Sequence, residues 1–209
     1  MMKKSLPAFE QSDLSIVSRE VKYDGFFKIH KLSLSHALFE GGQSEVFERE
    51  LCLRNDAVGM LLYDPSLQQL AMVEQMRIGA IDRNQSPWML EVVAGMLDKA
   101  CEAPCDVAIR EAKEEANLSV DAIEPMLDYF VSPGGSTEFF SLFVGKVSLS
   151  DVKGGVFGLA QENEDIRLHI LSVDEVFALL KQGQINNAMT LIALQWFALN
   201  KVNIDAKWQ

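Results

Sequence analysis

Gly95-Met-Leu-Asp-Lys-Ala-Cys-Glu102 is followed, after seven residues, by Arg110-Glu111-Ala-Lys-Glu114-Glu115-Ala-Asn117-Leu118. In a helix, the glutamates at 111, 114 and 115 fall within an arc of about 100° on one face. Like charges at these spacings repel, so the cluster costs stability unless a cation binds to it. Crowded carboxylate oxygens suit Mg²⁺ or Mn²⁺, and the alternative for three glutamates alone is a solvated acidic face.

The same stretch predicts a helix over about residues 104–116, because Pro104 suits a first helical turn. A second arc of this helix forms a packing face of Cys105, Ala108, Ile109, Ala112 and Ala116. Arg110 and Lys113 are expected to point away from the carboxylate arc. Asn117 ends the helix, where a left-handed residue is common.

The stretch from Gly95 to Leu118 resembles the Nudix box, the loop–helix–loop signature of hydrolases that cleave nucleoside diphosphates linked to another group. The family pattern is G-x5-E-x7-R-E-U-x-E-E-x-G-U, in which U is aliphatic. This chain departs from it twice: six residues separate Gly95 from Glu102, and Asn117 replaces the usual Gly. Neither departure touches the glutamates, so the resemblance implies a Nudix fold with hydrolase activity.

Composition limits the class of protein. With 209 residues and 48% hydrophobic content, the chain can bury one substantial core, or one core plus a small appendage. A net charge of −11 argues against a nucleic-acid partner but allows small phosphorylated substrates. The two N-terminal lysines precede no apolar stretch, and no apolar run is long enough to cross a membrane. We therefore expect a cytoplasmic enzyme.

Other reaction centres have weak support in the sequence. Cys52, Cys101 and Cys105 form an odd set with no second Cys pair or nearby His, so reduced thiols are expected rather than a zinc site. No P-loop occurs, and no Ser or Cys has the local context of a nucleophile. Direct attack by water is the simpler expectation.

Residues 13–54 are expected to form antiparallel strands, because apolar and polar residues alternate from Ile29 and Gly41-Gly42 marks a turn. This segment has little core of its own, so it should lean on another surface, such as a second subunit. The predicted division is therefore an N-terminal β unit at 1–54, used for dimerisation and substrate enclosure, and a hydrolase domain at 55–209.

The rest of the chain mixes strands and helices. Strands are predicted near 57–63, 70–76, 88–93, 126–131, 138–147 and 166–171, with a loop at 151–165. Ser172 and Glu175 have capping-box spacing for a helix that ends before Gly183. A last helix should run from Asn187 through Asn200, with core positions at Leu191, Ile192, Leu194, Ala198 and Leu199. This order fits an α/β/α sandwich around a mixed sheet.

Over nearly the whole chain, the sequence is similar to the bacterial ADP-ribose diphosphatases of the Nudix superfamily. The matching stretches are Gly25–Phe27, Glu74–Arg77, Pro87–Met96, Ser132–Glu138 and Gly158–Ile166. The resemblance implies hydrolysis of ADP-ribose to AMP and ribose 5-phosphate by a homodimer.

It also implies roles for single residues. The carbonyl of Ala94, with Glu111, Glu115 and Glu164, should hold Mg²⁺, for which Mn²⁺ is a substitute. Glu162 should be the base that activates water, although an extended loop would send Glu162 and Glu164 to the same side and permit exchanged roles. The substrate-binding residues should be Phe26, Phe27, Arg49, Glu50, Arg54, Arg77, Met96, Ser132, Pro133, Gly134 and Glu138, some of them contributed by the partner subunit.

Two alternatives stay open. One is a Nudix hydrolase that prefers another nucleotide sugar such as GDP-mannose, because the box residues handle only the diphosphate. The other is a non-catalytic Nudix-like regulator that senses a ligand. The intact box glutamates, the acidic charge and the missing basic winged-helix extension argue against that regulator.

Overall fold

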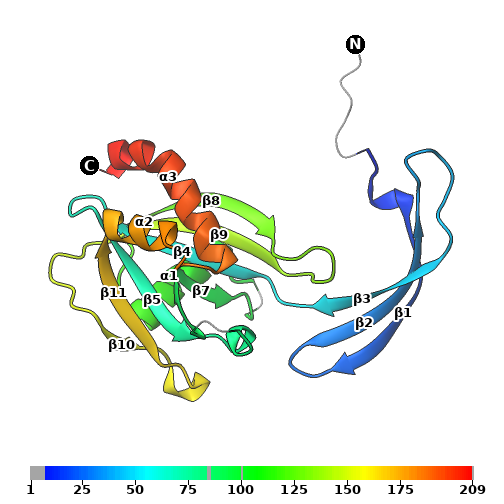
Figure 1. Ribbon diagram of the computed structural model, residues 1–209, viewed down its shortest axis with the longest axis horizontal. Coiled ribbons are helices and arrows are strands. Elements are labelled where there is room, and N and C mark those ends of the chain that lie inside the picture. The colour runs from blue at the N-terminus through cyan, green and yellow to red at the C-terminus, as the bar shows by residue number, and fades with distance from the viewer. Residues whose placement is uncertain (1–7, 84–85, 100, 209) are drawn as a thin grey trace, which may run out of the picture. The chain divides into compact units, whose positions relative to one another are not determined.

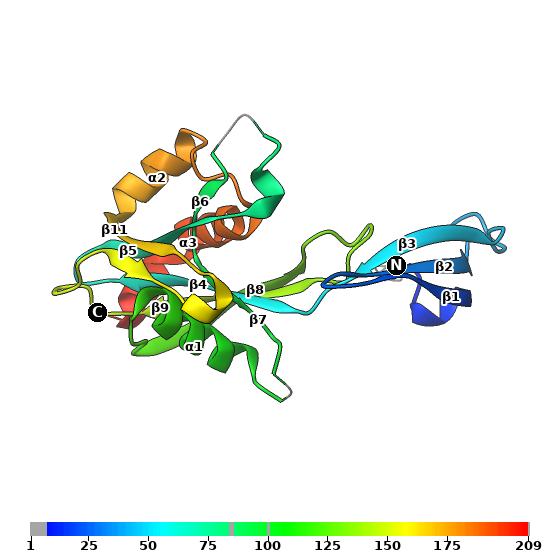
Figure 2. The ribbon, with the colours of Figure 1, turned by 90° about the horizontal axis from the view of Figure 1, so that it is seen from below.

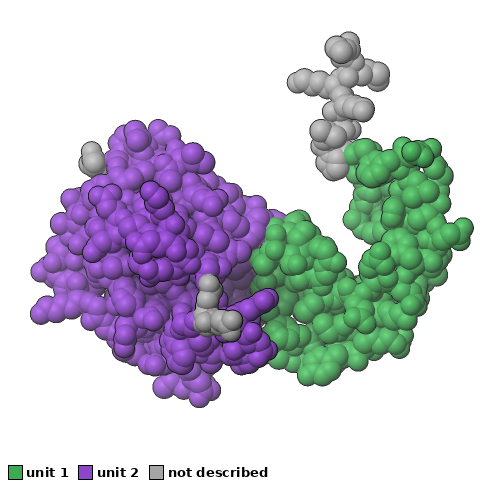
Figure 3. Space-filling view, in the orientation of Figure 1, with its two compact units in different colours: residues 1–55, 130–138 green, residues 56–129, 139–209 purple. Residues whose placement is uncertain are grey.

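The computed structural model describes residues 8–83, 86–99 and 101–208. They form two compact units (Figure 3). The first, here called the β unit, contains the described part of 1–55 together with 130–138. The second, the sandwich unit, contains 56–129 and the described part of 139–209.

The β unit is a three-stranded antiparallel sheet in the order β1-β2-β3 (Figure 1). A 3₁₀ turn, η1 (Gln11–Asp13), precedes β1 (Leu14–Asp24), β2 (Lys28–His36) and β3 (Phe47–Leu53). Residues 130–138 join this unit because Cys52 N–H donates to the Gly135 carbonyl at 2.8 Å, and Thr137 N–H donates to the Cys52 carbonyl at 3.0 Å. The N-terminal unit predicted from sequence, residues 1–54, did not include 130–138. This segment bonds to Cys52, which lies more than 80 residues earlier in the chain.

The β unit has little core of its own. Leu32 is the one buried hydrophobic residue in the described part of this unit. Apolar side chains of β1 are more than half exposed, among them Ile16, Val17, Val21 and Tyr23. Burial within one copy of this sheet therefore contributes little to its stability.

The sandwich unit is built on an eight-stranded sheet in the order β10-β11-β5-β4-β9-β8, with β6 paired to β5 and β7 paired to β4. The sheet is mixed, because β4 and β9 run parallel while β4–β5, β4–β7, β5–β6, β5–β11 and β10–β11 are antiparallel. The strands are β4 (Ala57–Asp64), β5 (Gln69–Met76), β6 (Trp88–Glu91), β7 (Val93–Met96), β8 (Ala122–Phe130), β9 (Phe139–Lys146), β10 (Gly155–Phe157) and β11 (Ile166–Ser172).

Helices cover both faces of this sheet (Figure 2). On one face α1 (Pro104–Ala116) packs through Val107, Ala108 and Ala112. On the other face lie α2 (Val173–Lys181) and α3 (Ala188–Trp208), the latter packing through Leu194 and Phe197. The predicted α/β/α sandwich around a mixed sheet is confirmed. Within the described residues, no helix combines the length and apolarity needed to cross a membrane.

Most element boundaries agree with the sequence. The helix at 104–116 is confirmed, and Asn117 follows it in the left-handed conformation with φ 54°. The Ser172–Glu175 capping box is present at the start of α2. The region 151–165 is wrong as a plain loop, because it contains β10 and a 3₁₀ turn, η3 (Ala160–Glu162).

The last helix begins where expected and ends later. The Asn187 side chain accepts from Thr190 N–H at 3.0 Å, but α3 continues to Trp208 rather than Asn200. Core positions assigned from sequence are wrong at Ala198 and Leu199, since both are exposed, while Leu194 is fully buried.

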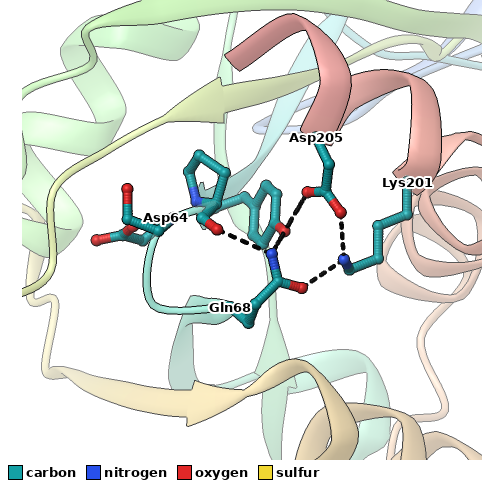
Figure 4. A network of polar contacts seen from close by, with 7 residues as sticks. Asp64, Gln68, Lys201 and Asp205 are labelled. Atoms are coloured by element: carbon teal, nitrogen blue, oxygen red, sulfur yellow. Dashed lines mark hydrogen bonds and ion pairs between the residues drawn. The ribbon is translucent and has the colours of Figure 1, made fainter. Parts of the chain in front are cut away.

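A polar network explains the longer helix (Figure 4). Tyr63 on β4 donates its hydroxyl to the Asp205 carboxylate at 2.5 Å. Lys201 donates to Asp205 at 2.6 Å and also to the Gln68 side chain. These contacts fix the last turns of α3 to the β4–β5 turn, where no propensity signal could place them.

Candidate active site

Helix α1 brings Glu115 into the interior beside strand β7. The side chain is 2% exposed, and one carboxylate oxygen accepts from the Ala94 N–H at 3.1 Å. The other oxygen lies 3.5 Å from Nε2 of Gln75 on β5. Glu115 therefore belongs to the buried face of the helix, while Ile109, assigned to that face from sequence, is 39% exposed.

Glu111 lies against the backbone of Gly95. A Cβ atom at position 95 would overlap the carboxylate of Glu111, so only glycine fits without displacing this side chain. The glycine of the box thus has a steric reason: it lets strand β7 and the carboxylate of α1 approach closely.

Arg110 is paired with the acidic residues around it. Its guanidinium lies 2.8 Å from Glu111, 3.0 Å from Glu114 and 3.4 Å from Glu102. The expectation that Arg110 points away from the carboxylate arc is wrong, because its long flexible stem lets the guanidinium fold back over the helix. One cation therefore offsets part of the repulsion among the glutamates.

Burial and mutual repulsion disfavour the charged forms of the Glu111 and Glu115 carboxyls. Burial raises the pKa of Glu115 to about 8, an effect partly offset by the Ala94 hydrogen bond and by Arg77, and reinforced by the charges of Glu111 and Glu164. Burial also raises the pKa of Glu111 to about 7, with opposition from Arg110 and reinforcement from Glu114 and Glu164. A divalent cation would reverse this balance, because it stabilises the ionised carboxylates.

Glu162 and Glu164, in the acidic loop at residues 151–165, have different surroundings. Glu164 is half-buried, and its carboxylate accepts from the Leu159 N–H at 2.9 Å. Gly158, at φ 104°, leaves room for it, since a Cβ there would lie 2.6 Å from Cβ of Glu164. Glu162 is exposed at the end of η3, and Asn163 follows with φ 57°. The extended loop assumed from sequence is therefore wrong, because the 3₁₀ turn and the left-handed residue separate the two side chains.

The predicted metal ligands lie near one another without forming a closed cluster. No three His, Cys, Asp or Glu side chains in the described ranges are grouped closely enough to hold an ion. Glu111 is instead paired with Arg110, and Glu164 is bonded to the Leu159 backbone. The donors are hard oxygens, which fit a divalent ion of the Mg²⁺ type. The assignment of Ala94, Glu111, Glu115 and Glu164 as ligands stays a prediction.

Within the β unit, several predicted substrate residues surround a hollow of about 320 Å³. The Arg54 guanidinium lies over the Phe27 ring at 4.8 Å and bonds to Glu138 at 2.9 Å. Phe26 is 80% exposed and meets Phe27 edge to face. The lining also includes residues that sequence reasoning missed: Tyr23, Ile29, Cys52 and Ser136.

The other predicted β-unit residues are not among those that line this hollow. Ser132, Pro133 and Gly134 form a turn closed by Ser136 N–H, which donates to the Ser132 carbonyl at 2.9 Å. Arg49 and Glu50 are successive residues of β3, so their side chains point to opposite faces of the sheet. Arg49 stacks over Phe47 at 4.6 Å.

The sandwich unit holds the last two predicted substrate residues. Met96 ends β7 and is 40% exposed. Arg77 follows β5, and its Nε donates to the Glu91 carboxylate at 2.7 Å. No role was assigned to Glu91 and Gln75 from sequence, although both are buried, with 4% and 8% exposed. The signal for Glu91 was a charged residue at the end of the otherwise apolar strand β6.

Comparison with known proteins decides the family. The NUDIX domain profile matches residues 53–194, more than half of the chain. The chain belongs to the Nudix family. This Nudix protein is 40% identical to an ADP-ribose pyrophosphatase of Haemophilus influenzae over 204 residues, covering 96% of this chain and 93% of that protein. It is also 40% identical to an ADP-ribose pyrophosphatase of Escherichia coli over 200 residues, covering 96% and 95%.

A GDP-mannose pyrophosphatase of Pectobacterium atrosepticum is 32% identical over 197 residues, covering 90% of this chain and 98% of that protein. A solved structure described as an ADP compounds hydrolase superposes with a TM-score of 0.69, covering 91% and 96% of the two chains. At 18% identity this structure supports the fold alone. The prediction of a Nudix hydrolase is confirmed, and the protein is an enzyme that hydrolyses a pyrophosphate bond. Nudix hydrolases generally need a divalent metal ion.

Proposed function

We propose that this Nudix hydrolase cleaves the diphosphate of ADP-ribose to give AMP and ribose 5-phosphate. The observation that carries this proposal is the 40% identity to ADP-ribose pyrophosphatases across 96% of the chain. The hollow in the β unit supports it, because the Phe27 ring and the Arg54 guanidinium provide planar groups on which an adenine could stack.

The proposed chemistry follows from a negatively charged substrate. Ala94, through its carbonyl, and Glu111, Glu115 and Glu164 would hold Mg²⁺, with Mn²⁺ as a substitute. When bound, such an ion neutralises the diphosphate and lowers the pKa of water. Glu162 would accept a proton from the attacking water as the bond to the leaving phosphate breaks in line with it. The exposed position of Glu162 in η3 leaves its carboxylate accessible to solvent water.

GDP-mannose is the second candidate substrate, and the 32% identity to a GDP-mannose pyrophosphatase favours it specifically. A panel of ADP-ribose, GDP-mannose, NADH and diadenosine polyphosphates separates the candidates by kcat/KM. We expect ADP-ribose to have the highest value, and we expect EDTA to abolish turnover until Mg²⁺ is added. A higher kcat/KM for GDP-mannose would overturn the assignment of ADP-ribose as the substrate, but it would leave the assignment to the Nudix family unchanged.

We propose in addition that the enzyme is a homodimer whose β units take part in the contact. Support comes from the exposed apolar side chains of β1 and from the single buried hydrophobic residue, Leu32, in the described β unit. A second copy would cover surface that one copy leaves in water. The same residues 1–54 would then serve both dimerisation and substrate enclosure, ahead of a hydrolase domain at 55–209.

The proposed compartment is the cytoplasm. Cys52, Cys101 and Cys105 are free cysteines, a state that reducing compartments maintain. Fractionation of cells that produce the protein, followed by detection with an antibody, would test this location.

A further inference from the structure

Among the residues that the structure describes, the buried carboxylate of Glu91 has one side-chain partner, Arg77. Glu91 ends β6 and is 4% exposed. Its Oε2 accepts from Nε of Arg77 at 2.7 Å. The backbone of Arg77 is tied to the same segment, since its N–H donates to the Pro87 carbonyl at 2.9 Å. Arg77 is therefore fixed at both its main chain and its guanidinium by residues that lead into and form β6.

The geometry of this bond leaves the outer end of Arg77 available. Nε is one of five guanidinium donors, and the two terminal nitrogens form the fork that matches phosphate oxygens. In residues 8–83, 86–99 and 101–208, the bond to Glu91 is the one hydrogen bond of the Arg77 side chain. The Arg77 side chain remains 41% exposed, so a solute can reach it.

Two residues before Arg77, Nε2 of Gln75 lies 3.5 Å from the carboxylate of Glu115 on α1. The positive charge of Arg77 acts on Glu115, whose pKa it lowers against the effect of burial. Arg77 thus acts on two buried carboxylates: it pairs directly with Glu91, and its charge reaches Glu115. A diphosphate that approached the α1 glutamates together with a cation would meet the Arg77 fork from the exposed side.

The pair is costly as a purely structural element. Burial raises the pKa of Glu91, although Arg77 opposes that rise, which shows that the ionised carboxylate is held in an unfavourable medium. An apolar residue of similar volume would pack without this penalty. What the carboxylate supplies in return for this cost is a fixed orientation of Arg77, through the 2.7 Å bond to Nε.

We infer that Glu91 is a positioning residue that holds the guanidinium of Arg77 side-on, so that its terminal nitrogens face the diphosphate of the substrate. The inference rests on the proposed diphosphate hydrolysis. It adds a residue that touches no substrate atom and acts only through Arg77.

A double-mutant cycle tests it with Arg77→Ala, Glu91→Met and the double variant. The substrate is the compound that the wild-type enzyme cleaves with the highest kcat/KM in the panel, so an error in the ADP-ribose assignment does not affect the cycle. Arg77→Ala should lose roughly 10- to 100-fold in kcat/KM, the value of one charge-assisted contact to phosphate. Glu91→Met should lose about as much, and adding it to Arg77→Ala should cost nothing further.

Three further measurements separate positioning from general damage. Glu91→Gln keeps an acceptor for Nε, so kcat/KM should recover to within about 3-fold of wild type, above the value for Glu91→Met. Asp205→Asn is the matched control, a partly buried carboxylate with a lysine partner, and should lower the melting temperature without changing KM. Circular dichroism should show the same folded spectrum for every variant.

Two outcomes would overturn the inference. If Glu91→Met lowers kcat/KM by the same factor in the Arg77→Ala background as in the wild type, Glu91 acts through the fold rather than through Arg77. If Arg77→Ala leaves kcat/KM unchanged, there is no oriented contact for Glu91 to support.

Discussion

Glu111 and Glu115 lie one turn apart on α1, and the protein holds them by different means. Glu115 is bonded to the Ala94 backbone in the interior, whereas Glu111 is paired with Arg110 beside Gly95. Both have raised pKa values because of burial and because negative charges are close by. Carboxyls whose pKa values are raised by burial and neighbouring charges are typical of functional sites, so their placement favours a functional role.

The first prediction concerns these two side chains. Changing Glu111 or Glu115 to Gln keeps the size and removes the ionic ligand, so activity should collapse while the circular dichroism spectrum is unchanged. Without metal, the free energy of unfolding should be equal or slightly higher, because carboxylate repulsion is relieved. Assays across a range of Mg²⁺ concentrations with a urea titration measure both quantities. Glu115→Gln with wild-type kcat would contradict the ligand role.

The second prediction divides the work between Glu162 and Glu164. Glu164 is half-buried near the α1 carboxylates, and Glu162 is exposed. Loss of a general base typically lowers kcat by about 10²- to 10⁴-fold. Glu162→Gln should therefore lower kcat at an unchanged Mg²⁺ requirement, whereas Glu164→Gln should shift that requirement upward. Exchanged phenotypes would make Glu164 the base, and two unimpaired variants would place the base elsewhere, with Glu114 and Glu138 next to be tested.

The carboxylates could be found from sequence because their spacing is local, at i, i+3 and i+4 of one helix. Their partners could not. Gln75, the side-chain partner of Glu115, comes from a strand 40 residues earlier, and Glu91, the partner of Arg77, lies 14 residues after that arginine. Arg110 was assigned the wrong direction because helical spacing places a Cβ atom but leaves the rotamers of a long side chain open.

At the scale of the element, α1 carries both apolar packing residues and acidic residues, and the two sets overlap on its buried face. Sequence periodicity separated an apolar arc from a carboxylate arc, yet Glu115 and Ala112 are buried together. The helix boundaries were predicted because Pro104 and Asn117 are local signals. The end of α3 was not, because Lys201 and Asp205 are held by Tyr63 and Gln68, which are more than 130 residues earlier.

The third prediction concerns the pH dependence of stability that α1 confers. The pKa values of Glu111 and Glu115 are about 7 and about 8 in the folded protein, above the ordinary value of 4.5. The folded state therefore binds protons more tightly than the unfolded state, and stability falls as the pH rises through this interval. Urea titrations in EDTA should give a lower free energy of unfolding at pH 8 than at pH 5.

Two comparisons check the cause of that slope. Mg²⁺ should stabilise the protein more at pH 8 than at pH 6, because it binds the deprotonated carboxylates. Glu115→Gln should flatten the dependence measured in EDTA. A slope that is unchanged in Glu115→Gln would assign the pH dependence to other groups.

At the scale of the whole molecule, the two units differ in how much hydrophobic core each of them buries. The sandwich unit has two hydrophobic clusters, one on each face of its sheet. The β unit has Leu32 as its one buried hydrophobic residue among the described positions, and β1 has exposed apolar side chains along its length. Sequence alternation indicated the strands, but the attachment of residues 130–138 depends on backbone bonds to β3 that no local pattern encodes.

The last prediction follows from that difference. Light scattering at micromolar concentration should give about twice the chain mass of 23.3 kDa. Replacing Val17 and Val21 of β1 together by Lys should shift the mass toward that of the monomer, since each side chain is more than half exposed in one copy and a partner would have to bury the charge. Leu199→Lys with Val202→Lys is the matched control on α3, where the two side chains are 85% and 81% exposed. If the two α3 substitutions dissociate the dimer and the two β1 substitutions do not, the contact between subunits lies on the sandwich unit. A wild-type protein that is monomeric and fully active would reject both the dimer and the shared site.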